Sequence, residues 1–143
     1  MPVWQASMSI AEQVFTLTDN LPRKEDYGFT SQIRRSALSI SANIAEAFGR
    51  SHSLDKVKFY YVARGSLTET QSHLEYGKRV GYIDPKSAQE LDSRLALIHN
   101  DLNRVIATLR RSTKGSQPPA LTQPQPSPFL SQPSLFLQGR SQP

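Results

Sequence analysis

The chain has 143 residues, a net charge of +5 at neutral pH, 37% hydrophobic residues and no cysteine. This length fits a single domain, and the absence of cysteine excludes disulfides, thiolate metal sites and thiol nucleophiles. The N-terminus lacks a basic segment followed by a long apolar run. We therefore expect a cytoplasmic protein with neither a signal peptide nor a membrane span.

The positive charge is modest once the chain is divided. Residues 1–111 contain 15 of the 17 Lys and Arg and all 12 Asp and Glu, which leaves a net charge of +3. Such a domain is compatible with nucleic-acid binding but does not require it. Phosphate contact depends on the clustering of cations more than on their total number.

Apolar residues at steps of three and four predict a first helix over residues 3–19. Leu21-Pro22 ends it, because the residue before a proline disfavours the helical conformation. A second helix is predicted to begin near Asp26 or Thr30, either of which could cap it, and to stop at Gly49. One face of this helix carries Ile33, Ala37, Ile40, Ile44 and Phe48.

A third helix is predicted to begin after Ser51 or Ser53 and to run to about residue 80. Its inward stripe, whose small members would let a neighbouring helix approach closely, comprises Phe59, Val62, Ala63, Ser66, Leu67, Thr70, Leu74 and Gly77. A fourth helix is predicted to follow, with Asp84 as its cap and Pro85 at its first position. Its heptad seam is typical of helical bundles and comprises Ala88, Leu91, Leu95, Ile98, Leu102, Val105 and Leu109.

The composition changes at Ser112. Seven of the ten prolines lie between Pro118 and Pro143, among many Ser and Gln, which excludes a helix or a central strand. We therefore predict an all-α fold, an antiparallel up-down four-helix bundle over residues 1–111, followed by a disordered tail over residues 112–143. The segment 126–131 is loosely echoed by 132–137, and each carries an apolar cluster that is either a short docking motif or without function.

Several linked motifs across residues 4–111 resemble one protein family. They are GFTSQIRR at residues 28–35, SISANIAE at 39–46, Gly49-Arg50, ARGSLTE at 63–69 and Gly81-Tyr82-Ile83. In this order they resemble the four-helix-bundle proteins encoded in the intervening sequences of bacterial 23S rRNA genes. The chain departs from that pattern at Ala47, where the family usually has glycine, and at Phe29, where it usually has leucine. Alanine favours a helix by about 1 kcal/mol over glycine, so the second helix should be firmer here.

The resemblance implies a homopentamer in which five bundles surround a central channel. The accessory variability protein of diversity-generating retroelements has a similar fold, and it is a basic pentamer that binds the element's reverse transcriptase and nucleic acid. From the resemblance we expect a non-catalytic oligomer that binds RNA or an RNA–DNA intermediate. Its second and third helices would form the subunit interfaces, and its tail would tether a partner such as a reverse transcriptase.

Basic residues near the helix ends are the candidates for phosphate contact. In a pentamer a charge of +3 per domain becomes roughly +15 per particle, a density that favours phosphate binding. The alternative is that these residues form solvated faces and intersubunit salt bridges. The nucleic-acid-binding candidates are Arg23, Lys24, Arg34, Arg35, Arg50, Arg64, Lys78 and Arg79, and the fourth helix adds further charge at Arg94, Arg104, Arg110 and Arg111.

A second set of polar residues lies on or near apolar faces, where buried groups must be paired. We interpret this set as a hydrogen-bonded network that fixes the helix register or the subunit interface; its members are Gln32, Asn43, Glu46 and Glu69. A catalytic pair of Glu46 and Glu69 is the alternative. No nucleophile or metal cluster accompanies that pair, so we expect no enzyme.

No cofactor or metal site is predicted, because the three histidines are spread singly and the glycines are too dispersed for a phosphate-binding loop. We assign Trp4, Phe15 and Phe59 to packing, and we expect either Tyr60 or Tyr61 to face outward or into a subunit contact. A protein–protein adaptor without nucleic-acid binding remains the second functional hypothesis. The modest charge of the helical region and the apolar clusters of the tail favour it.

Overall fold

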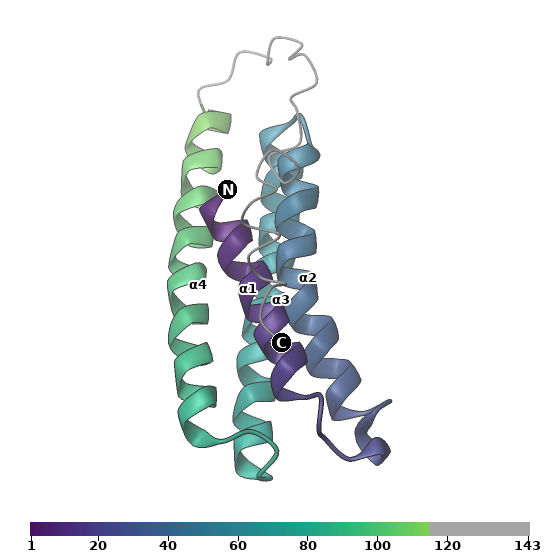
Figure 1. Ribbon diagram of the computed structural model, residues 1–143. Helices are drawn as coiled ribbons and strands as arrows, with labels where there is room; N and C mark the ends of the chain where they lie inside the picture. Colours follow the sequence, from purple (N-terminus) through teal and green to yellow (C-terminus); the bar gives the residue numbers. More distant parts are fainter. Residues whose placement is uncertain (115–143) are drawn as a thin grey trace.

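The computed structural model describes residues 1–114, which form an antiparallel up-down bundle of four α-helices (Figure 1). The helices are α1 (Pro2–Leu17), α2 (Phe29–Gly49), α3 (Ser53–Arg79) and α4 (Pro85–Lys114), and a short 3-10 helix, η1 (Arg23–Glu25), precedes α2. The predicted all-α fold is confirmed. The first three residues of the predicted tail, 112–114, belong to α4, and the predicted disorder and apolar clusters lie outside the described residues.

The helices form a ring around one core. Each of them packs against the helices before and after it in the chain, and α1 packs against α4 to close the ring. Aliphatic side chains at helical spacing fill the centre, and the largest of those that are completely buried are Ile10, Ile33, Ile40, Ile44, Leu67, Leu74, Leu91, Leu95 and Leu102. The predicted faces of α2 and α4 therefore account for most of this core.

One of the two aromatic residues of α1 that the sequence assigned to packing lies outside the inward face. Ser7 and Ile10 are buried, whereas Phe15, which the sequence assigned to packing, is 55% exposed. That assignment was wrong because α1 contacts only α2 and α4, so its apolar stripe is wider than the face that these helices cover. Trp4 is half-buried and packs against the core, as predicted.

One predicted member of the inward stripe of α3 faces outward instead. Val57 and Tyr60 are buried, whereas Val62 is 51% exposed, so its assignment to the inward stripe was wrong. The helix is covered by α2 and α4 alone, and Val62 lies outside the arc that they cover. Phe59 packs against the core, and Tyr61 is the partly exposed member of the tyrosine pair, both as predicted.

The start of α2 is capped by a different residue from those predicted. Gly28 occupies the N-cap position, and the Glu25 carboxylate accepts the Phe29 N–H at 3.2 Å and the Tyr82 O–H at 3.1 Å. A carboxylate is favourable beside the free amides of a helix start. The Asp26 and Thr30 caps were therefore wrong; Asp26 is exposed, and the Thr30 hydroxyl is buried without a hydrogen-bond partner among the described residues.

The turn between α3 and α4 closes one end of the bundle. The Asp84 carboxylate accepts the Ser87 N–H at 2.9 Å, so the predicted cap of α4 is confirmed, and this bonding lowers the pKa of Asp84. Gly81 has a φ of +82°, in the region that favours glycine. Gly77, in the last turns of α3, leaves room for two apolar side chains: a methyl group placed there would lie 2.7 Å from the Phe29 ring and 2.9 Å from Ile83.

We predict that Gly77→Ala lowers the free energy of unfolding by about 1–2 kcal/mol. Overpacking costs about 1–3 kcal/mol, and the better helix propensity of alanine returns up to about 1 kcal/mol. Gly65→Ala is the matched control, because Gly65 is exposed within the same helix and a methyl group there meets nothing within 4 Å. Urea denaturation should show a loss for the first variant and no loss for the second. Equal effects would contradict the close approach at Gly77.

Candidate nucleic-acid interface

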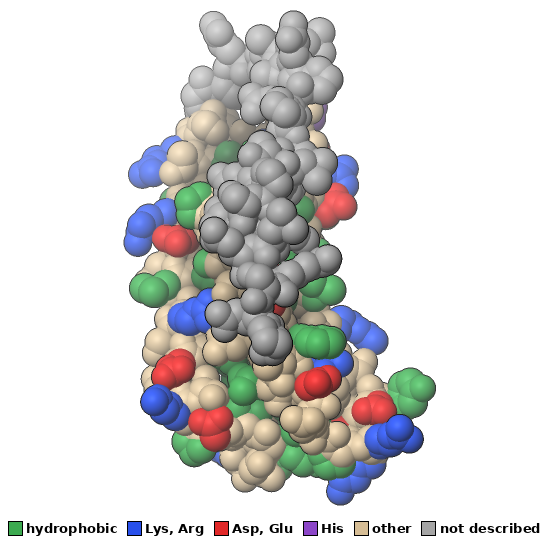
Figure 2. Space-filling model, viewed as in Figure 1, with side chains coloured by type: hydrophobic (Ala, Val, Ile, Leu, Met, Phe, Trp, Pro, Cys, Tyr) green, Lys and Arg blue, Asp and Glu red, His purple; other side chains and the backbone are tan. Residues whose placement is uncertain are grey.

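The structure separates the eight predicted basic residues into different environments. Arg23 and Lys24 are exposed on η1, near the closed turn end of the bundle, and Arg35 is exposed on α2. Lys78 and Arg79 both form ion pairs with Glu75, at 2.7 and 3.0 Å, and these contacts lower the pKa of the Glu75 carboxyl. Figure 2 shows the same feature more widely, since many Lys and Arg side chains on the visible face lie beside Asp or Glu.

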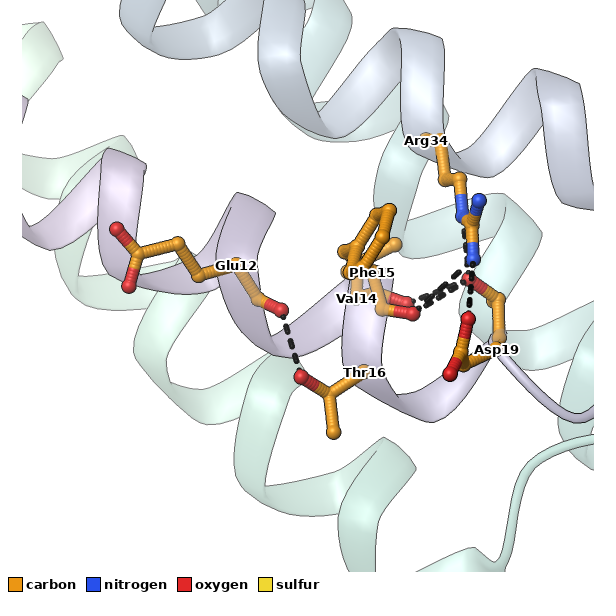
Figure 3. Close-up of polar contacts among 7 residues, drawn as sticks. Glu12, Val14, Phe15, Thr16, Asp19 and Arg34 are labelled. Atoms are coloured by element: carbon orange, nitrogen blue, oxygen red, sulfur yellow. Dashed lines mark hydrogen bonds and ion pairs between the residues drawn. The ribbon is translucent and has the colours of Figure 1, made fainter. Parts of the chain in front are cut away.

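Arg34 joins α1 to α2 and is not a free cation. Its guanidinium donates to the Thr18 hydroxyl at 2.8 Å and to the Phe15 carbonyl at 3.2 Å (Figure 3). The same group stacks 4.3 Å from the centre of the Phe15 ring and lies 3.9 Å from Asp19. These contacts engage the Nε and one Nη of the guanidinium and hold it against α1, so Arg34 is a structural residue in this conformation.

Positive charge concentrates at one end of the bundle. Residues 46–64 and 101–113 meet there, since the hydroxyls of Ser53 and Ser112 are 3.4 Å apart and Arg64 donates to Asn103 at 2.9 Å. These two stretches, which we call the basic end, contain seven Lys and Arg against three Asp and Glu, a net charge of +4. The other residues up to 113 contain eight Lys and Arg against nine Asp and Glu, a net charge of −1.

Aromatic rings lie directly under the arginines of the basic end. The Arg64 and Arg110 guanidinium groups are 5.0 and 5.9 Å from the centre of the Tyr61 ring, and Arg50 is 4.6 Å from that of Phe59. Each distance is within the range of cation–π attraction. Guanidinium groups beside half-exposed rings offer both phosphate donors and stacking surfaces.

The cations of the basic end differ in whether they already form ion pairs with Asp or Glu. Arg50 pairs with Glu46 at 3.3 Å, and Arg104 pairs with Asp101 at 3.6 Å. Within residues 1–113, three exposed cations of this end form no ion pair, and they are Lys58, Arg110 and Arg111. They are the ones most available to an anionic ligand, and none belongs to the eight candidates selected from the sequence.

Lys56 has a structural position at the same end. Its ammonium group donates to the Ala47 and Phe48 carbonyls, both at 3.1 Å, and so provides hydrogen-bond partners for carbonyl groups at the end of α2. Burial lowers the pKa of Lys56. The carbonyl contacts fix this lysine to α2, so we do not count it as a phosphate contact.

The predicted polar residues do not form one network in the described chain. Asn43 donates to the Ser39 carbonyl and hydroxyl, at 2.8 and 2.9 Å, whereas Gln32 is exposed. Glu46 pairs with Arg50 and Glu69 with His73, each within its own helix, so the structure does not bring the two carboxylates together.

The polar contacts between α2 and α3 come instead from hydroxyl groups. Ser39 and Ser66 are 2.8 Å apart, and the Thr70 hydroxyl lies 2.9 Å from that of Ser36 and donates to the Ser66 carbonyl at 2.8 Å. We call these four side chains the hydroxyl ladder. Sequence reasoning missed it, although small hydroxyl residues recurring at steps of three and four on an apolar face are a usable signal.

Within residues 1–114, no group of three or more His, Asp or Glu could hold a metal ion, and no helix is long and apolar enough to cross a membrane.

An open hollow of about 400 Å³ lies on the outer surface of α2, lined by Ala42, Ala45, Glu46, Gly49 and Arg50. Three of these residues have small side chains, so another helix or chain segment can approach the backbone of α2 closely here.

The fold and this surface define a small all-α bundle with a basic end. The chain belongs to the 23S rRNA-intervening sequence protein family, whose model matches residues 1–104. It is similar to the crystal structure of a protein of unknown function from the S23 ribosomal protein family of Bacteroides thetaiotaomicron. That structure is 26% identical, with a TM-score of 0.67, over 73% of this chain and 97% of the other. No protein with a curated description shows significant similarity to this chain.

We predict that Arg34→Ala lowers the free energy of unfolding by about 1–2 kcal/mol, because hydrogen bonds from a charged donor and a cation–π contact are lost. Arg35→Ala is the matched control. Its side chain is exposed, and surface substitutions usually change stability by less than about 0.5 kcal/mol. Thermal and urea unfolding of the two variants would test this difference. Equal stabilities would show that the Arg34 contacts contribute little.

Proposed function

We propose that this protein is a non-catalytic, homo-oligomeric accessory protein that holds RNA, or an RNA–DNA intermediate, at its basic end. One observation carries the proposal. The net positive charge of the described helices lies wholly at this end, where unpaired cations adjoin half-exposed rings. Clustered Lys and Arg supply the electrostatic part of nucleic-acid affinity.

The arrangement favours single-stranded or looped RNA over a regular duplex. Flexible cations at Lys58, Arg110 and Arg111 can follow a phosphate backbone, and the Tyr61 ring with its two arginines offers a surface on which an unpaired base can stack. Family membership supports RNA as the ligand, because the family's description refers to 23S rRNA. A retroelement reverse transcriptase is the protein partner that we propose, on the resemblance of the motifs alone.

Assembly into a pentamer would strengthen the basic end by repetition. Five copies bring five such ends onto one particle and raise the local potential without changing any single contact. The outer surfaces of α2 and α3 are suited to such an interface. Ala42 and Gly49 are small exposed residues of α2, and Val62 on α3 is an exposed apolar residue.

We predict that the triple variant Lys58→Ala, Arg110→Ala, Arg111→Ala binds single-stranded RNA at least about tenfold more weakly at low salt. Each lost phosphate contact should also reduce the slope of log K against log salt by about 0.7. Fluorescence anisotropy with a labelled single-stranded RNA at several salt concentrations measures both quantities.

The matched control removes three positive charges from the opposite end, in the variant Arg23→Ala, Lys24→Ala, Lys86→Ala. These three side chains are also exposed, so the two triple variants have the same net charge. The control should bind RNA nearly as well as the unaltered protein. Equal losses in both variants would show that the basic end is not a site, and binding that does not depend on salt would exclude phosphate contact. A protein that binds no RNA would favour the adaptor hypothesis.

We predict a particle of about 80 kDa in native mass spectrometry, which is five chains of 16.0 kDa. Val62→Gln should shift the distribution toward smaller species, because it places an amide in the proposed contact between subunits. Leu97→Gln is the control, since Leu97 is equally apolar and 66% exposed, but lies on α4. A monomeric protein, or equal effects of the two variants, would contradict the proposed interface.

A further inference from the structure

An uncovered apolar surface runs along the boundary between α1 and α2. Phe15 of α1 and Leu38 of α2 are 55% and 54% exposed, and Met8, Ala11 and Ala45 beside them are half-buried. We call these five residues the α1–α2 stripe. It is separate from the basic end, and the RNA-binding proposal does not use it.

The members of the stripe are neighbours because of helix geometry. Residues three and four apart share one edge of a helix, so Met8, Ala11 and Phe15 form one edge of α1. The contact between Arg34 and the Phe15 ring shows that this edge faces α2 (Figure 3). Leu38 follows Arg34 by one turn on the same edge of α2, and the two helices are antiparallel, which places Leu38 beside the middle of α1.

The stripe differs from Leu97, a large apolar residue that is exposed by itself on α4. Leu97 is more exposed than Leu38, but the residues one turn before and after it are Ser93, Arg94, Asn100 and Asp101. Single apolar residues in polar surroundings are common on protein surfaces and need no partner. A row of adjacent ones usually marks a contact surface.

We propose that residues 129–137 of the same chain cover the α1–α2 stripe. The 29 residues after Lys114 contain one basic residue and no acidic residue. Apart from Leu121, their bulky apolar side chains gather in two clusters, Phe129-Leu130 and Leu135-Phe136-Leu137. A nearly uncharged segment with paired apolar clusters matches a stripe whose five side chains are uncharged. The one cation in contact with it, Arg34 on the Phe15 ring, already pairs with Asp19. The attraction is therefore hydrophobic, and it should persist in salt that weakens RNA binding.

The chain length permits this contact. Residues 115–128 can span up to about 46–50 Å when extended, whereas the 30 residues of α4 measure about 45 Å along the helix axis. The segment can thus return along the bundle from the end of α4 to any part of the stripe. Met8 and Phe15 are about 10 Å apart along α1, and the two clusters, six residues apart, can separate by up to about 20 Å. Both clusters can therefore reach the stripe together.

The chain contains no cysteine, so in a crosslinking test disulfides can form only between cysteines that are introduced. A cysteine at Ser131→Cys, between the two clusters, is combined with Ala45→Cys in the stripe, and oxidation is followed by non-reducing electrophoresis of the full chain. The control pairs Ser131→Cys with Ala96→Cys on α4, which is more exposed than Ala45 and would react faster if the segment sampled the surface at random.

The expected result is an intrachain disulfide, at the mass of one chain, that forms at least tenfold faster for the Ala45→Cys pair than for the control. Adding Phe129→Ser, Leu135→Ser and Phe136→Ser should remove this difference in the rate of disulfide formation without altering the bundle. Equal rates in the two pairs would overturn the proposal, as would an advantage that survives the serine substitutions. A disulfide mainly between two chains would show that a second copy covers the stripe, and would also overturn it.

Discussion

The close packing of α2 against α3 is the constraint on which the rest of the bundle depends. Their facing side chains are small, so the two backbones can approach, but the hydroxyls buried by this approach must be paired. Three of the four hydroxyls also bond within their own helix, and the contacts Ser39–Ser66 and Ser36–Thr70 are added only when the two helices keep one register. Gly77 has the same effect toward the turn end, where it leaves room for the Phe29 ring.

The antiparallel arrangement also determines where the charges meet. The short connection of residues 50–52 keeps the end of α2 beside the start of α3, where Lys56 donates to the last carbonyls of α2. The packing of α4 against α3 brings the end of α4 to the same place. Two helix C-termini therefore lie together, and each attracts cations through its partial negative charge. Arg50, Arg110 and Arg111 contribute to helix stability at these ends and at the same time create a surface that suits phosphate. Charge-matched variants at the two ends of the bundle separate these roles.

The sequence predicted the helices well and the site less well, for different physical reasons. Helix boundaries follow from local signals such as Asp84-Pro85 and Gly49, which act on the adjacent backbone. Whether a charged side chain is available to a ligand depends on partners that are distant in the sequence. Arg34 and Arg35 are adjacent in the sequence, yet their directions on the helix differ by about 100°. Only Arg34 hydrogen-bonds to Phe15 and Thr18 at the end of α1.

The sequence by itself determined the class of fold, the four helices, the buried seams of α2 and α4 and the family, because periodicity and motif order are properties of the chain. Only the tertiary structure decided that Phe15 and Val62 are exposed, since the width of a buried face depends on which helices cover it. It also decided that the net positive charge lies at one end. That separation arises when antiparallel helices bring together residues 39 to 59 positions apart, such as Arg64 with Asn103 and Ser53 with Ser112, and no local pattern in the chain predicts it.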